Sequence, residues 1–245
     1  MIIGSKLIFR ESLSSSNSYA AKLLKIEAVQ EGTIIYTNYQ TTGRGQTGNT
    51  WESEDGKNLL ISLILYPLMI KPSDQFIISK IISLGICDYL RQQTTNVSIK
   101  WPNDIYVNND KIAGILIEAS IIRDEIENII AGIGLNINQK IFKSDAPNPV
   151  SLGMITGKSY NIEECLKSLA SCLDRRYKQI LHGKISDIDS DYLSNLYRIG
   201  QWCDYSDTNG LFEGRINSVN PSGRLQIEDR RGRIYEYAFK EVNFL

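Results

Sequence analysis

Two short segments of the sequence combine residue types that could hold an anion. The first, residues 43–48, reads Gly-Arg-Gly-Gln-Thr-Gly within the polar, glycine-rich stretch 40–57. Glycines leave backbone N–H groups exposed, and a guanidinium can clamp an anion through two parallel hydrogen bonds. A structureless stretch of this length in a compact domain is usually functional, although an ordinary surface connection is the alternative. The segment therefore predicts an anion-binding loop built on Arg44.

The second segment, residues 100–104, reads Lys-Trp-Pro-Asn-Asp where a strand is expected to end. Pro102 restrains the turn and Trp101 can pack beneath it, which would hold Lys100 in one direction. A lysine in that place, beside an anion-binding loop, could stabilise negative charge that develops during a reaction. For this segment by itself, a solvated lysine next to a structural tryptophan is an equally good interpretation.

Two other interpretations of the glycine pattern do not fit its surroundings. In the dinucleotide-binding pattern Gly-x-Gly-x-x-Gly, the third glycine opens a helix, whereas here turn-like residues lead into a strand. In the phosphate-binding loop of nucleotide hydrolases, Gly-Lys-Ser/Thr closes the motif, and that triplet does not follow here.

Composition excludes several classes of protein. Of the 245 residues, 42% are hydrophobic and 22% charged, as in globular proteins, and the net charge of −1 provides no basic field for nucleic acid. Four cysteines without Cys-x-x-Cys spacing, and the lone His182 at an expected helix end, argue against zinc and redox sites. We see no signal peptide and no apolar run of the ~20 residues that a membrane span needs, so we expect a cytoplasmic protein.

Hydrophobic periodicity predicts an α+β body followed by a small all-β tail. The expected helices cover 18–28, 73–91 (capped by Ser73), 162–181 and 185–196. The expected strands of the body cover 33–39, 58–66, 97–101, 105–107, 111–118 and 129–138, with 139–158 irregular. Asn108-Asn109-Asp110 indicates a hairpin. The expected strands of the tail cover 211–219, 224–228 and 234–239.

Together, in this order and spacing, the two segments resemble the catalytic core of biotin protein ligases. The resemblance extends over almost the whole chain and includes a further set of motifs. These are Ser15-Ser16-Asn17 (the family's Ser-Thr-Asn biotin contact), Gln40 with Gly43-Arg44-Gly45 (its adenylate-binding loop), Trp51 (its loop tryptophan), Lys-Trp-Pro-Asn-Asp at 100–104, Lys-Ile-Ala-Gly-Ile-Leu at 111–116, Gly-Ile-Gly-Leu-Asn at 132–136, and Gly214 with Gly223-Arg224-Leu225 in the tail.

The resemblance implies an α+β fold in which helices flank a mixed sheet, as in class II aminoacyl-tRNA synthetases. This catalytic domain would cover residues 1–198, and a small SH3-like β-barrel would cover 199–245. Because the motifs begin almost at the first residue, we expect the monofunctional type that lacks the DNA-binding domain. The family usually has arginine at position 46, where this chain has Gln46, so one cation near the adenylate is missing.

In the family, the carboxylate of biotin attacks the α-phosphate of Mg-ATP and gives biotinyl-5′-AMP and pyrophosphate. A lysine of a biotin carboxyl carrier protein then displaces AMP. The resemblance thus implies biotin and Mg-ATP as substrates, Mg²⁺, and a carrier-protein partner, without zinc, a redox cofactor, DNA or a membrane. A homodimer is compatible with it.

By the same resemblance, Lys100 and Arg44 are the catalytic residues. The residues expected to contact biotin are Ser15, Ser16, Asn17, Gln40, Gly43, Arg44, Gly45, Gln46, Lys100 and Gly114. Those expected to contact ATP are Arg44, Trp51, Lys100 and Asn136. Asp104 is the candidate contact for Mg²⁺, with a turn-forming aspartate as an equally good interpretation.

Two other functions are weighed against this one. Lipoate ligases and octanoyl transferases share the broader fold, but their Arg-Arg…Gly-Gly-Gly…His or cysteine-nucleophile signatures do not occur in this sequence. A biotin-binding sensor without turnover would use the same pocket. The presence of Lys100 and Arg44 argues against the sensor, because binding alone needs no group that stabilises developing charge.

Overall fold

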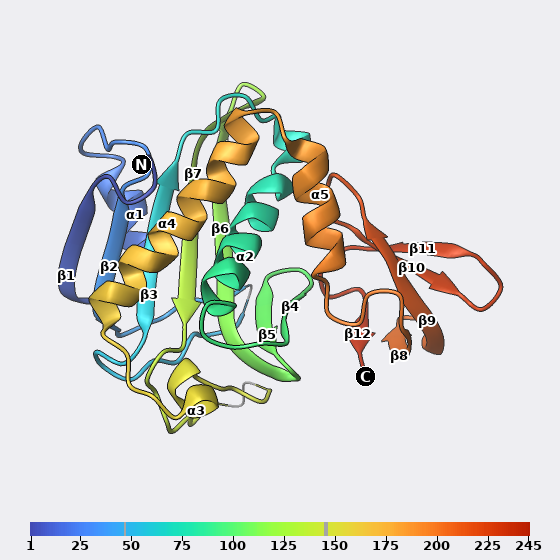
Figure 1. Cartoon of the computed structure of the whole chain (residues 1–245). Helices are drawn as coiled ribbons and strands as arrows, with labels where there is room; N and C mark the ends of the chain where they lie inside the picture. Colours follow the sequence, from blue (N-terminus) through green and yellow to red (C-terminus); the bar gives the residue numbers. More distant parts are fainter. Residues whose placement is uncertain (47, 145–146) are drawn as a thin grey trace.

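A seven-stranded mixed sheet forms the centre of the protein in the computed structural model, which describes residues 1–46, 48–144 and 147–245 (Figure 1). Thr47 of the glycine-rich loop and residues 145–146 of the expected irregular stretch lie outside the described residues. The strand order is β1-β2-β3-β7-β6-β5-β4, with β1 and β2 parallel and all other neighbours antiparallel. The strands are β1 (Leu7–Leu13), β2 (Ile34–Gln40), β3 (Leu59–Leu65), β4 (Val97–Lys100), β5 (Asp104–Val107), β6 (Asp110–Ile122) and β7 (Glu125–Leu135).

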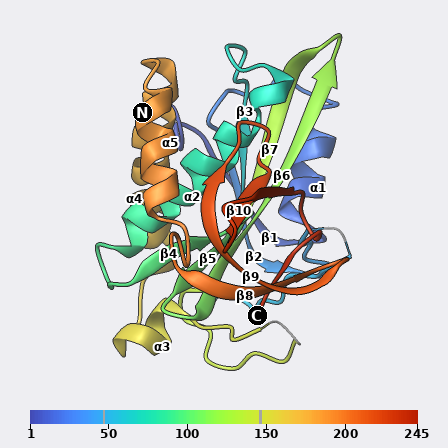
Figure 2. The same cartoon turned by 90° about the vertical axis from the view of Figure 1, so that its right-hand side faces the viewer.

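Helices cover both faces of this sheet, as Figure 2 shows. On one face lie α2 (Phe76–Leu90), α4 (Ile162–Leu181) and α5 (Ile185–Ser194), and on the other lies the short helix α1 (Ser16–Leu23). β3 reads Leu-Leu-Ile-Ser-Leu-Ile-Leu and is buried throughout, because both of its faces are covered. No helix in the described ranges is both long and apolar enough to span a membrane.

A second sheet of five antiparallel strands follows, in the order β11-β10-β9-β8-β12, and is consistent with the expected SH3-like domain. Its strands are β8 (Trp202–Asp207), β9 (Gly210–Val219), β10 (Leu225–Asp229), β11 (Ile234–Tyr237) and β12 (Asn243–Phe244). The indole Nε1 of Trp101 donates a hydrogen bond to Gly223 O at 2.9 Å and so joins the second sheet to the end of β4. The predicted fold class is confirmed, and the boundary at 198/199 stays a prediction.

The expected elements that carry the clearest patterns are confirmed. α4 covers Ile162–Leu181 as expected, and β5 and β6 form the hairpin that the Asn-Asn-Asp turn indicates, with Val107 paired to Asp110. Strands β1 and β8 were not expected from the sequence. β1 lies at a sheet edge and most of its residues are exposed, so it lacks the apolar alternation that marks a half-buried strand.

Two helix starts differ from the expectation. α1 begins at Ser16 rather than Ser18, because the Ser15 side chain caps it by accepting from Ser18 N, and it ends at Leu23 in a tighter turn. The expected cap at Ser73 is wrong. Pro72–Asp74 forms a 3₁₀ turn of its own, and α2 begins after Gln75 without a side-chain cap.

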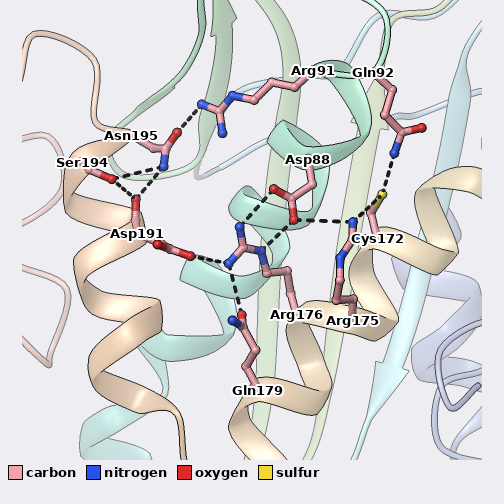
Figure 3. A network of polar contacts seen from close by, with 10 residues as sticks. All are labelled: Asp88, Arg91, Gln92, Cys172, Arg175, Arg176, Gln179, Asp191, Ser194 and Asn195. Carbon is pink, nitrogen blue, oxygen red and sulfur yellow. Dashed lines mark hydrogen bonds and ion pairs between the residues drawn. The ribbon is translucent and has the colours of Figure 1, made fainter.

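A polar network joins α2, α4 and α5, the three helices on one face of the sheet, to one another (Figure 3). Arg176 of α4 binds both carboxylate oxygens of Asp88 on α2, at 2.7 and 3.0 Å, and Asp191 on α5 at 2.5 Å. Arg91 donates to Val97 O at 2.8 Å and to the side chain of Asn195, which ties α2 to β4 and α5. The network therefore helps to hold β4, and with it Lys100.

Replacing Arg176 by methionine should lower the free energy of unfolding by roughly 1–3 kcal/mol, since it removes the guanidinium that contacts the partly buried carboxylates of Asp88 and Asp191 and leaves Asp88 only the distant Arg175. The matched control is Arg175→Met. The side chain of Arg175 is 64% exposed and lies 3.9 Å from Asp88, so its loss should cost less than ~0.5 kcal/mol. Urea unfolding curves measure both, and equal midpoints for the two variants would contradict the assignment.

Candidate active site

A cavity of about 370 Å³ brings together residues from separate parts of the chain. Its walls come from the start of α1, the glycine-rich loop, the β4–β5 turn, strands β6 and β7, and the segment around β12, together with Ile61 of β3 and Pro147. Most of the site residues expected from the sequence line it, namely Ser15, Ser16, Asn17, Gln40, Arg44, Gly45, Gln46, Trp51, Lys100, Asp104 and Gly114.

Neutral polar groups form one end of the cavity. Ser16 and Asn17 begin α1 and are almost fully buried. Ser16 N donates to Gln40 Oε1 at 2.7 Å, and Ser62 Oγ lies 2.7 Å from Ser16 Oγ and 2.5 Å from Asn17 Oδ1. A Cβ on Gly132 would lie 2.5 Å from Asn17 Oδ1, so a glycine is needed there. This end can hydrogen-bond an uncharged, polar ligand group.

The glycine-rich loop folds back on itself as a narrow hairpin at the rim. Arg44 pairs with Thr50, Trp51 N donates to Gly43 O at 3.0 Å, and Gly45 N donates to Asn49 O at 2.9 Å. A Cβ on Gly43 would lie 2.4 Å from Trp51 O, so any side chain there would separate the two arms. Gly43 is thus structural in this arrangement and does not line the cavity.

The ring of Trp51 lies directly on the backbone of the two central strands. Gly114 on β6 and Gly134 on β7 face each other in register, and Cβ atoms there would come within 2.8 and 2.3 Å of the ring. Its Nε1 is buried and has no hydrogen-bond partner in the part of the chain that the structure describes. The same ring also borders a smaller cavity of about 50 Å³, which Asn136 lines. Asn136 Oδ1 is buried and likewise has no partner among the described residues.

Lys100 enters the cavity from the end of β4 between two aromatic rings. Its Nζ lies 3.1 Å from Tyr106 OH, 4.9 Å from the centre of the Tyr106 ring and 5.5 Å from that of Phe244 on β12. Burial lowers the pKa of Lys100; Asp104 opposes this shift, and Arg198 and Lys111 add to it. A cation that is partly shielded from water in this way interacts more strongly with a ligand anion than a fully solvated one does.

Asp104 and Lys111 form an ion pair in the same wall. Lys111 Nζ lies 2.7 Å from Asp104 Oδ1 and 5.8 Å from the centre of the Trp51 ring. In the described part of the chain, no group of three His, Cys, Asp or Glu side chains is placed to hold a metal ion. The assignment of Asp104 to Mg²⁺ stays a prediction.

Three residues at the site were missed by the sequence analysis. Ser62 is the one polar residue in the apolar run of β3, and that contrast could have identified it. Glu118, which pairs with Arg44, lies on the same strand face as Gly114, because side chains alternate along β6. Phe244 has no local signal, since it reaches Lys100 only through the placement of the second sheet.

Comparison with known proteins identifies the family. The pattern of the biotin/lipoate A/B protein ligase family matches residues 9–136. The bifunctional ligase/repressor BirA of Bacillus subtilis is 30% identical over 94% of this chain and 72% of its own length. The chain belongs to the biotin/lipoate A/B protein ligase family. It is an enzyme, a ligase of the biotin protein ligase type.

Other relatives agree in sequence and in fold. The biotin–[acetyl-CoA-carboxylase] ligase of Paracoccus denitrificans is 28% identical over 90% of this chain and 95% of its own. A biotin protein ligase from Aquifex aeolicus, solved with biotin and ATP, superposes with a TM-score of 0.80 at 24% identity, covering 98% of this chain and 99% of its own. The last comparison supports the fold of both sheets.

Replacing Phe244 by alanine should raise the pKa of Lys100 toward the ~10.4 of a free lysine, because it admits water to the ammonium group. Since burial lowers the pKa, the wild-type lysine should lose its proton at lower pH than the variant's. ¹³C NMR titration of lysine labelled at Cε measures both. Phe239→Ala, at another cavity-lining ring, is the control that should leave Lys100 unchanged. Identical titrations in wild type and Phe244→Ala would contradict the role of this ring.

Proposed function

We propose that this ligase activates biotin with ATP to biotinyl-5′-AMP and transfers the biotinyl group to a lysine of a biotin carboxyl carrier protein. The observation that carries the proposal is that one cavity is lined both by neutral polar side chains, Ser16, Asn17 and Gln40, and by two cations, Lys100 and Arg44. Biotin has the matching distribution of groups, with a neutral ureido head and a terminal carboxylate.

The polar end favours biotin over lipoate within the family. A ureido group offers two N–H donors and a carbonyl acceptor, which Ser16, Asn17 and Gln40 can pair. Gln40 Oε1 already accepts from Ser16 N, so Gln40 Nε2 can act as the donor. The dithiolane ring of lipoate would instead leave these buried polar groups with fewer partners, and each unpaired group costs about 1–3 kcal/mol.

Trp51 and Asn136 support the placement of the nucleotide. Trp51 borders both cavities, so an adenine ring in contact with it would lie close to Asn136. The unpartnered Oδ1 of Asn136 could accept a hydrogen bond from the amino group of adenine. Arg44 and Lys100 would then lie on the phosphate side.

Mg²⁺ would accompany ATP and neutralise part of the charge of its phosphates. This ion usually keeps several waters and takes only one or two protein carboxylates besides the phosphates, so a lone Asp104 in the wall is compatible with it. Asp104 Oδ1 is engaged by Lys111 at 2.7 Å. We propose Asp104 as the protein contact of this ion.

The protein's own cations oppose the main electrostatic barrier. Two unit charges 4 Å apart repel by ~4 kcal/mol at an effective dielectric constant of 20, and the biotin carboxylate must approach a polyanion. Lys100 and Arg44 offset this repulsion. A carboxylate oxygen bonds to the α-phosphorus, and the bond to the bridging oxygen breaks with its electron pair leaving on pyrophosphate. The carrier lysine nitrogen then attacks the biotinyl carbonyl carbon, and AMP leaves.

The decisive experiment follows labelled biotin. The protein is incubated with labelled biotin, Mg-ATP and a biotin carboxyl carrier domain, and both pyrophosphate release and label on the carrier are measured. We expect both, with no label when ATP is omitted and no competition from excess lipoate. Binding of biotin without pyrophosphate release would identify a sensor instead, and preferential use of lipoate would identify the other branch of the family.

Lys100→Ala should slow biotin-dependent pyrophosphate release by at least ~10²-fold, the usual scale for loss of one preorganised charge contact. Circular dichroism should be unchanged, since Lys100 ends a strand and its Nζ hydrogen-bonds to Tyr106 OH, a contact on which no helix or strand depends. Lys167→Ala, at an exposed site on α4, is the control and should keep full activity. Near-normal release by Lys100→Ala would remove this residue from the mechanism.

Gln46→Arg should slow dissociation of biotinyl-5′-AMP by about ten-fold, because a guanidinium adds a positive charge beside the adenylate phosphate. Gln46 lines the cavity, and its Oε1 is buried without a hydrogen-bond partner among residues 1–46, 48–144 and 147–245. Two of the other cavity cations are already paired with carboxylates, Arg44 with Glu118 and Lys111 with Asp104. Gln46→Met, which adds no charge, is the control. Stopped-flow off-rates decide, and equal rates in wild type and Gln46→Arg would mean that the charge at position 46 is irrelevant.

A further inference from the structure

Glu118 lies at the edge of the cavity without lining it. Side chains alternate along β6, so Gly114, Leu116 and Glu118 face the same side of the sheet, toward α1. Gly114 and Leu116 both line the cavity, and Glu118 is two residues farther along the strand. Its side chain is 35% exposed, so it is reachable by water and by neighbouring groups.

The two carboxylate oxygens of Glu118 contact two different parts of the site. Oε1 binds Arg44 Nη2 of the hairpin loop at 2.5 Å, and Oε2 accepts from Asn17 Nδ2 of α1 at 2.8 Å. One side chain thus connects the loop that carries the proposed anion clamp with the helix that carries the proposed biotin contacts.

The contact with Arg44 is exchangeable. The Arg44 side chain is 46% exposed, and its other partner is the neutral Ser18 Oγ at 3.3 Å. Ion pairs between partly exposed groups contribute little to stability, and phosphates attract a guanidinium at least as well as a carboxylate does. An anion that enters the cavity therefore competes directly with Glu118 for Arg44.

The contact with Asn17 sets the direction of that amide. Asn17 Nδ2 donates to Glu118 Oε2 and, at 3.3 Å, to Leu116 O, while Asn17 Oδ1 faces Ser62 Oγ at 2.5 Å. A strong acceptor on the Nδ2 side makes the reverse orientation of the amide unfavourable, because it would place oxygen against oxygen. Glu118 thereby keeps the acceptor of Asn17 on the Ser62 side of the site.

We propose that Glu118 is a positioning residue that holds Arg44 at the rim when no anion is bound, releases it to the phosphates of ATP, and orients Asn17 throughout. This inference rests on the proposed function. Glu118 competes with ATP for Arg44, so its charge weakens ATP binding, whereas its acceptor oxygen supports the biotin contact. The two effects are opposite in sign and separable by substitution.

Glu118→Gln removes the charge but retains an oxygen that can accept from Asn17 Nδ2. We expect the KM for ATP to fall about three-fold and the KM for biotin to stay within two-fold of wild type. Glu118→Ala also removes the acceptor, and we expect its KM for biotin to rise about ten-fold. Glu127→Gln is the matched control, because Glu127 lies on the adjoining strand and accepts from the neutral Ser120; both of its KM values should be those of wild type.

A double-mutant cycle tests whether Glu118 acts through Arg44. In an Arg44→Met background, Glu118→Gln should no longer change the affinity for ATP, measured by calorimetry with a non-hydrolysable ATP analogue. The same change in both backgrounds, or no change in either, would overturn the proposal.

Urea midpoints equal to wild type show that the variants are folded. If wild type fails to release pyrophosphate from ATP and biotin, the proposed function has failed; an active wild type with an unaltered Glu118→Gln refutes only this inference.

Discussion

The site depends on one steric constraint, the lack of side chains at three positions on the α1-facing side of the central sheet. Gly114 and Gly134 oppose each other on β6 and β7, and Gly132 lies two residues before Gly134. The ring of Trp51 lies against Gly114 and Gly134, and the side chain of Asn17 lies against Gly132. A Cβ atom at any of the three glycines would collide with these side chains. Because these glycines leave only backbone on this face of β6 and β7, the glycine-rich loop and α1 can both lie close to the two strands. Any larger residue there would push the polar and aromatic walls apart.

The charges around these glycines are arranged unequally. Arg44 forms an ion pair with Glu118, and Lys111 forms one with Asp104. The carboxylates therefore offset the positive charges of these two residues before a ligand binds. Lys100 has instead a tyrosine hydroxyl and two aromatic rings, and burial lowers its pKa. Because Lys100 forms no ion pair among the described residues and is partly desolvated, a phosphate gains favourable energy by approaching it. The paired cations can adjust afterwards by exchanging partners.

The sequence predicted the parts of the site that depend on contiguous residues. Lys-Trp-Pro-Asn-Asp at 100–104 and the glycine pattern at 132–136 are contiguous motifs of the resemblance to biotin protein ligases, and they lie where β4 and β7 end. The central strands and α4 were predicted from their own hydrophobic pattern. β1 was missed because an exposed edge strand has no apolar alternation, and the Ser73 cap failed because Pro72 starts a separate turn. Glu118 and Phe244 could not be identified from local sequence, because each belongs to the site through a partner that is distant in the chain. Glu118 pairs with Arg44, and Phe244 lies beside Lys100.

The second sheet is part of the site rather than an attachment to it. Trp101 follows Lys100 in the chain, and its indole bonds to Gly223 O, while Gly223 itself packs against Phe76 at the start of α2. β12 pairs with β8 and brings Phe244 over the ammonium group of Lys100. A residue that bonds to the second sheet, Trp101, is thus the immediate neighbour of Lys100, whose ammonium group lies beside Phe244 of that sheet. A displacement of the second sheet would therefore change the hydration of Lys100 before it changed anything at the neutral end of the cavity, where Ser16 and Asn17 depend on α1 and β3.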